Sequence, residues 1–113
     1  MVKMITCITQ PKKLYEIIDA LTEAGIVGVT VTDVRGYGKQ RGRVGHLRGA
    51  AYEVRLLPKV RLDIALPDEK AQTAVDVLLR TARSGEIGDG KVLLTTLEEA
   101  WRIRTGESGE IAL

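Results

Sequence analysis

Two glycine-rich stretches of this sequence could hold an anion. RGYGKQRGRVGHLRG, residues 35–49, combines five glycines and five basic side chains without an acid, and IGDGK, residues 87–91, ends in a lysine. Because glycine lacks a Cβ atom, the backbone N–H groups of such turns can converge on a phosphate. Neither stretch matches a Walker A sequence, and neither opens a helix as a Rossmann fingerprint does. By itself, GDG is most often a simple turn.

Two arginines near the end of the chain offer a second kind of anion contact. WRIRTGE, residues 101–107, places Arg102 and Arg104 two positions apart, so in an extended segment they would share a face. Two guanidinium groups on one face suit a polyphosphate, although in isolation the pair is better explained as solvated surface charge. The chain displays no set of nucleophile, base and orienting residue, so we do not expect an enzyme.

The positive charge is concentrated in one segment. The formal net charge is +2, yet residues 35–61 contain eight Lys or Arg side chains and a single acid, Glu53. A small anion is the natural ligand of such a segment. Single-stranded RNA is an alternative, because RGYG at 35–38 begins like an RNA-recognition motif. That motif next requires a stacking aromatic residue where Lys39 and Gln40 stand, and the first strand supplies no aromatic partner.

Four strands and two helices are expected to position these stretches. Alternating or β-branched apolar runs predict strands at residues 2–9, 26–34, 59–67 and 91–97. Helical spacing of apolar residues predicts one helix that begins near Pro11 and stops at Gly25, and a second that begins near Asp68 and stops at Gly85. In the second helix we expect the following residues to face inward: Ala71, Ala74, Val75, Leu78, Leu79 and Ala82.

The element order βαββαβ predicts a ferredoxin-like α+β sandwich, a single domain over residues 1–113. The helices would cover one sheet face, so burial of aliphatic side chains on the other face favours an oligomer. Residues 36–55 form a long connection between the two central strands, and connections of this length are usually functional or disordered. Cys7 is the single cysteine; it suits a reducing cytosol and is expected to be a buried small hydrophobe. We find no signal peptide or membrane-spanning run and expect a cytoplasmic protein.

In combination and in order, these motifs resemble the P-II nitrogen-regulatory signal-transduction proteins along nearly the whole chain. Four blocks carry the resemblance at the family's spacing: VRGYGKQRG, YEVRLLPKVRLDI, TARSGEIGDGKV and RIRTGE. The resemblance implies a homotrimer of ferredoxin-like subunits, with ATP/ADP sites in the clefts between subunits. It also implies that 2-oxoglutarate binds beside Mg-ATP at the base of a flexible loop, residues 37–55, which docks on target proteins.

The resemblance also assigns roles to individual residues. Lys59 in LLPK matches the lysine that pairs with a 2-oxoglutarate carboxylate, and Gln40 matches the glutamine that lies in the same effector site and ligates Mg²⁺ through its side-chain oxygen. A phosphate loop is expected at residues 84–91, and residues 101–108 would reach the phosphates from the neighbouring subunit. The implied nucleotide-binding residues are Thr30, Gly36, Gly38, Lys39, Gln40, Asp63, Gly88, Asp89, Gly90, Lys91, Arg102 and Arg104.

The tip of the long loop departs from the family pattern. Tyr52 matches the tyrosine that is uridylylated in some bacterial members, but Ala51 and Arg55 stand where acidic residues are common. Ala50 replaces the serine that is phosphorylated in cyanobacterial members. Expected targets are nitrogen-metabolism transporters, enzymes or regulators, an ammonium transporter among them, with no nucleic acid and no membrane insertion. The nearest alternative is a divergent adenine-nucleotide sensor that responds to a different small anion.

Overall fold

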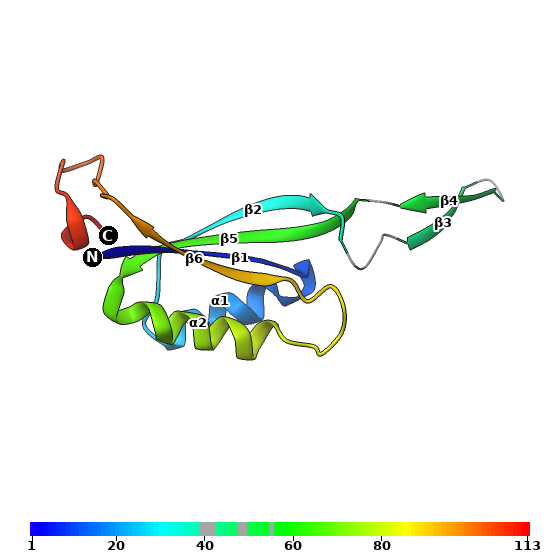
Figure 1. Cartoon of the computed structure of the whole chain (residues 1–113), viewed down its shortest axis with the longest axis horizontal. Helices are drawn as coiled ribbons and strands as arrows, with labels where there is room; N and C mark the ends of the chain where they lie inside the picture. Colours follow the sequence, from blue (N-terminus) through cyan, green and yellow to red (C-terminus); the bar gives the residue numbers. More distant parts are fainter. Residues whose placement is uncertain (39–42, 48–49, 55) are drawn as a thin grey trace.

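The computed structural model describes residues 1–38 and 56–113, together with the backbone of residues 43–47 and 50–54. Four strands, β1 (Val2–Thr9), β2 (Val29–Gly36), β5 (Leu57–Pro67) and β6 (Lys91–Leu97), form one antiparallel sheet in the order β2-β5-β1-β6. Helices α1 (Leu14–Glu23) and α2 (Asp68–Ala82) cover one face of this sheet (Figure 1). This arrangement confirms the predicted ferredoxin-like fold.

The core between sheet and helices is aliphatic. On β5, Val60, Leu62, Ile64 and Leu66 are all buried and alternate with residues that face away from the helices. They meet Ile17 and Leu21 of α1 and Ala74 and Leu78 of α2 in one cluster. Cys7 belongs to the same cluster, as predicted, and burial raises the pKa of its thiol to about 11.

The helix boundaries follow local chemistry. A single 3-10 turn, η1 (Pro11–Lys13), leads into α1, and proline suits that position because its missing N–H would have no helical partner. Gly25 has φ +79 after α1 and donates its N–H to the Thr22 carbonyl at 3.0 Å, so it ends the helix as predicted. The prediction that Leu79 faces inward is wrong: its side chain is 46% exposed, because Val77, Leu78, Thr81 and Ala82 occupy the buried stripe.

The long connection contains more regular structure than its composition suggested. Strands β3 (Arg43–Leu47) and β4 (Ala50–Val54) pair antiparallel as a separate two-stranded sheet, with Leu47 opposite Ala50. This hairpin projects beyond the ends of β2 and β5 and contributes to a longest dimension of 58 Å (Figure 1). The remaining elements agree with expectation to within three residues, except for a 3-10 turn, η2 (Gly109–Ala112), near the end of the chain.

Candidate functional site

An open cleft of about 580 Å³ lies where β2 and β5 lead into the projecting hairpin. One wall is the segment that precedes β6, and the other comes from the ends of β1, β2 and β5. The cleft brings together both glycine-rich stretches and the LLPK lysine. Its lining residues are Ile8, Gly36, Tyr37, Gly38, Leu57, Lys59, Glu86, Ile87, Gly88, Asp89, Gly90 and Lys91.

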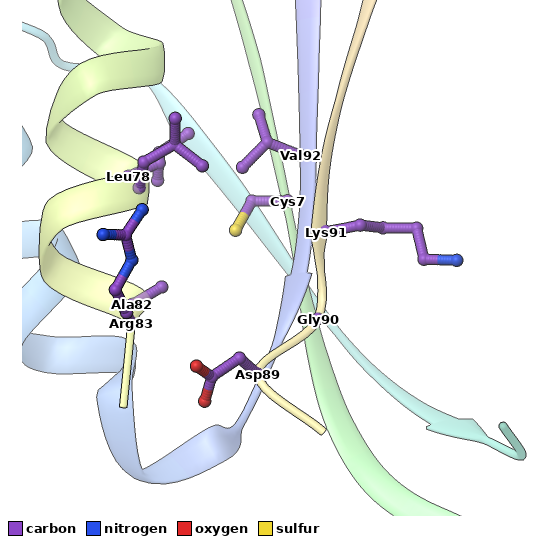
Figure 2. A pocket seen from close by; sticks show the side chains of 9 residues that line it. Cys7, Leu78, Ala82, Arg83, Asp89, Gly90, Lys91 and Val92 are labelled. Carbon is purple, nitrogen blue, oxygen red and sulfur yellow. The ribbon is translucent and has the colours of Figure 1, made fainter. Parts of the chain in front are cut away.

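The Asp89 side chain closes the predicted phosphate loop through hydrogen bonds within the loop. Its carboxylate accepts hydrogen bonds from the N–H groups of Ser84 at 2.8 Å and Gly85 at 2.9 Å, and from the Ser84 hydroxyl. These bonds, the Ser84 side chain first, hold the pKa of Asp89 below its ordinary value. Figure 2 shows the carboxylate on the α2 side of the sheet, whereas the Lys91 side chain lies on the opposite side.

Two carbonyl groups of the loop are tied to the strands beside it. The Gly88 oxygen accepts hydrogen bonds from Gln10 Nε2 at 2.8 Å and from Lys59 Nζ at 3.0 Å. The Asp89 oxygen accepts one from the Thr9 hydroxyl at 2.7 Å. The loop is therefore held by both β1 and β5, and the Lys59 ammonium stands in the cleft beside it.

Gly90 sits where no other residue fits. Its φ is +98, and a Cβ atom built on it would lie 1.8 Å from the backbone oxygen of Ile8. Real Cβ atoms essentially never approach another heavy atom within 3.0 Å, and here the obstacle is main chain that cannot rotate away. The close passage of the loop over β1 thus requires glycine.

Thr30 and Asp63, predicted nucleotide contacts, lie away from this cleft within one chain. They are paired opposite each other, Thr30 near the start of β2 and Asp63 near the middle of β5. Asp63 is four residues along β5 from Lys59, about 13 Å in an extended strand. Its carboxylate accepts hydrogen bonds from Arg61 Nε at 2.9 Å and Thr6 Oγ1 at 2.6 Å, and the Arg61 bond is the main reason that the pKa of Asp63 is lowered.

Arg102 and Arg104 lie at the other end of the sheet. Lys91 begins β6 beside the cleft, and Leu97 ends it opposite Val2, about 20 Å farther along the strand. The segment that follows is a turn closed by a bridge between Trp101 and Ser108, not an extended segment. Arg102 contacts the Glu107 carboxylate at 3.4 Å and the Leu113 oxygen at 3.0 Å, and Arg104 is exposed. Neither guanidinium can complete the cleft of its own chain.

The family model described as Nitrogen regulatory protein P-II matches residues 2–107. This chain belongs to the P-II family. It is 44% identical over 111 residues to the nitrogen regulatory protein GlnK of Escherichia coli, a match covering 98% of this chain and 99% of the relative. It is 48% identical over 107 residues to nitrogen regulatory protein P-II of Bradyrhizobium diazoefficiens, covering 95% and 96%.

Family membership fixes the broad function of the chain. P-II proteins are nitrogen-regulatory signal-transduction proteins, and the relatives named here are regulators, so this P-II protein has a role in nitrogen regulation and is not an enzyme. The RNA-binding alternative gains no support from these matches. No helix in the described part of the chain is long and apolar enough to cross a membrane.

Of three residues of the predicted site in this P-II protein, the structure describes no side chain. Lys39 and Gln40 fall outside the described residues, and of Tyr52 only the backbone is described, in β4 opposite Gly45. Over residues 1–38 and 56–113, no group of three or more His, Cys, Asp or Glu side chains could hold a metal. The described part of the cleft is lined by two lysines, two acids and glycine backbone.

Sequence reasoning missed the residues that build the loop of this P-II protein. Thr9, which ends β1, and Gln10, which follows it, contact the loop carbonyls directly, but TQ before a proline carries no signal of such a role. The Ser84–Asp89 pairing is more accessible, because aspartate commonly accepts hydrogen bonds from nearby backbone N–H groups in turns. Its five-residue spacing in SGEIGD could have indicated a closed loop.

Proposed function

We propose that this P-II protein is a homotrimeric, cytoplasmic sensor that binds ATP or ADP and, in the presence of Mg-ATP, 2-oxoglutarate. Residues 37–55 would carry the resulting signal to nitrogen-metabolism transporters, enzymes or regulators. The observation that carries the proposal is the cleft itself. It joins the two glycine-rich stretches around Lys59 and Lys91 at the base of the projecting hairpin.

The chemistry of the cleft suits phosphate. Glycines 36, 38, 88 and 90 leave backbone exposed to a ligand, and Lys59 and Lys91 add positive charge. Two acids, Glu86 and Asp89, line the cleft. The Asp89 carboxylate already accepts hydrogen bonds from the N–H groups of Ser84 and Gly85. Mg²⁺ would arrive with ATP and be held by phosphate oxygens and Gln40, since hard cations prefer oxygen ligands.

A neighbouring subunit would supply the remaining contacts. Arg102 and Arg104 are too far from their own cleft to contact its ligand, whereas in a trimer they could approach the cleft of the next chain. Large apolar side chains near them support an interface: Trp101 is 67% exposed, and Ile103 is fully exposed. Thr30 and Asp63, which lie between the two ends of the sheet, would then contact the base and ribose.

The proposed effector link runs through Lys59. Its ammonium has three donors, and it holds the Gly88 carbonyl of the phosphate loop while standing at the foot of the hairpin. A 2-oxoglutarate carboxylate bound to Lys59 and to the Mg-ATP assembly would favour one arrangement of residues 37–55. An effector shifts such a population by its differential affinity for the two arrangements. Tyr52, in β4, is the proposed modification site on this hairpin.

Calorimetry with Lys59→Ala and the matched control Lys12→Ala tests the proposal. Lys12 is exposed and does not line the cleft. We expect all three proteins to bind ATP and Lys59→Ala to lose at least about tenfold in 2-oxoglutarate affinity, the scale of one charged hydrogen bond. Unchanged 2-oxoglutarate binding by Lys59→Ala would overturn the assignment. Equal losses of ATP and 2-oxoglutarate affinity would show that Lys59 acts through the loop instead.

A further inference from the structure

The hydroxyl of Thr9 is buried and is committed to the loop beside the cleft. Thr9 ends β1, its side chain is fully buried, and Oγ1 donates to the Asp89 carbonyl at 2.7 Å. A buried hydroxyl with such a partner fixes the direction of the carbonyl that it bonds, because leaving either group unpaired is costly.

The two faces of the sheet are clearly distinguished at this position. Alternation along β1 places Thr9 on the face of Cys7, which is covered by the helices, and places Ile8 on the opposite face. Ile8 pairs with Lys91, and both line the cleft. Figure 2 shows the same division on β6, where Val92 lies on the α2 side with Cys7 and the Lys91 side chain lies on the other.

The orientation of the peptide between Asp89 and Gly90 follows from the Thr9 hydrogen bond and from the division of the sheet into a helix face and a cleft face. No peptide bond in the described chain is cis, and in a trans peptide the C=O and N–H groups point in opposite directions. Thr9 holds the Asp89 carbonyl on the helix side. We propose that Thr9 is a positioning residue that thereby aims the N–H of Gly90 into the cleft, as a donor to a phosphate oxygen.

The surroundings of the peptide prevent it from turning over. The Asp89 carboxylate is held by Ser84 and Gly85, and the Gly88 carbonyl by Gln10 and Lys59. Gly90 itself passes so close to Ile8 that its Cα position has no room to move toward β1. A donor fixed in advance loses less freedom when it binds, so Thr9 contributes to affinity without touching the ligand.

The inference rests on the proposed function for its ligand, and the test separates the two. Thr9→Val keeps the shape of the side chain but removes the donor, whereas Thr9→Ser keeps the donor. For the wild type and both variants, ATP affinity would be measured by calorimetry. The Gly90 amide resonance would be followed by ¹⁵N NMR during titration with ATP and, separately, with sodium pyrophosphate. Circular dichroism melts establish that each variant is folded.

We expect Thr9→Val to bind ATP about tenfold more weakly, the scale of one hydrogen bond to a charged group, with the Gly90 response reduced for both ligands. Thr9→Ser should retain wild-type affinity and response, which a merely space-filling role would not require. Wild-type behaviour of a folded Thr9→Val would overturn the inference. If that variant does not fold, the test is the Gly90 amide resonance of the wild type. If this resonance responds neither to ATP nor to pyrophosphate, the inference is overturned. Absence of ATP binding, with a hydroxyl-dependent pyrophosphate response, would refute the proposed nucleotide function alone.

Discussion

Replacing Gly90 by alanine should disrupt the loop beside the cleft. The new Cβ would lie 1.8 Å from the Ile8 oxygen and 2.9 Å from the Thr9 Cα, and must retreat from main chain to at least 3.0 Å. The retreat pulls the Asp89 carbonyl away from the Thr9 hydroxyl, which now stands 2.7 Å from it. Alanine at φ +98 adds backbone strain, because a Cβ disfavours the left-handed region.

A matched control, Gly85→Ala, separates the cost of backbone strain from the cost of the lost hydrogen bond. Left-handed strain costs about 1–2 kcal/mol, and an unpaired buried hydroxyl costs about 1–3 kcal/mol, so Gly90→Ala should lose about 2–5 kcal/mol in free energy of unfolding. Gly85 has a similar φ, +90, but a Cβ there meets no atom within 4 Å. Gly85→Ala should therefore lose only the strain, about 1–2 kcal/mol.

Denaturant unfolding at one fixed protein concentration measures both variants, since the stability of an oligomer depends on concentration. The loss in Gly90→Ala should exceed that in Gly85→Ala by about 1–3 kcal/mol. Equal losses in the two variants would refute the claim that the loop passes against the β1 backbone.

Two further predictions concern titrating groups. Asp89→Asn should be less stable than the wild type at pH 7, because folding lowers the pKa of Asp89 and the ionised carboxylate therefore stabilises the native state. The stability difference should shrink as pH falls below the pKa of an unfolded aspartate, about 3.9. A difference that stays the same between pH 7 and pH 3 in denaturant melts would contradict this prediction. Cys7 has a pKa of about 11 and is only 1% exposed. At pH 8 it should react with a thiol reagent at least about a hundredfold more slowly in the native protein than in guanidinium. Similar rates in the two conditions would show that the Cys7 thiol is accessible in the native protein.

The fold was accessible from sequence because its core elements carry strong periodic signals. Val60, Leu62, Ile64 and Leu66 alternate on β5 with Arg61, Asp63 and Ala65, and burial of the four larger aliphatic residues follows from that alternation. The hairpin within residues 37–55 was not anticipated. Its strands are only five residues long and lie among glycines and charged residues. The prediction therefore followed the composition of the segment and gave a long connection without strands. The two residues between Leu47 and Ala50 are a spacing typical of a hairpin, which could have been used.

Part of the candidate site could be predicted from the sequence. Glycine and lysine motifs indicated which segments form the cleft, because their chemistry is local and can be seen in short runs such as GDGK. The sequence could not indicate that Thr9 and Gln10 hold the loop carbonyls, because those contacts join residues far apart in the chain. The pairing of Asp89 with Ser84 joins residues only five positions apart, and the run SGEIGD could have indicated it. The role proposed for Arg102 and Arg104 requires a second subunit, which one chain does not contain.

The most direct test of the central claim is a calorimetric titration of the wild-type protein with 2-oxoglutarate. Three conditions are compared: protein alone, protein with ADP, and protein with Mg-ATP. The account predicts binding in the presence of Mg-ATP and none in the other two, because Lys59 and the metal-bound nucleotide would form the site together. Absence of binding in all three conditions, or equal binding without nucleotide, would contradict it.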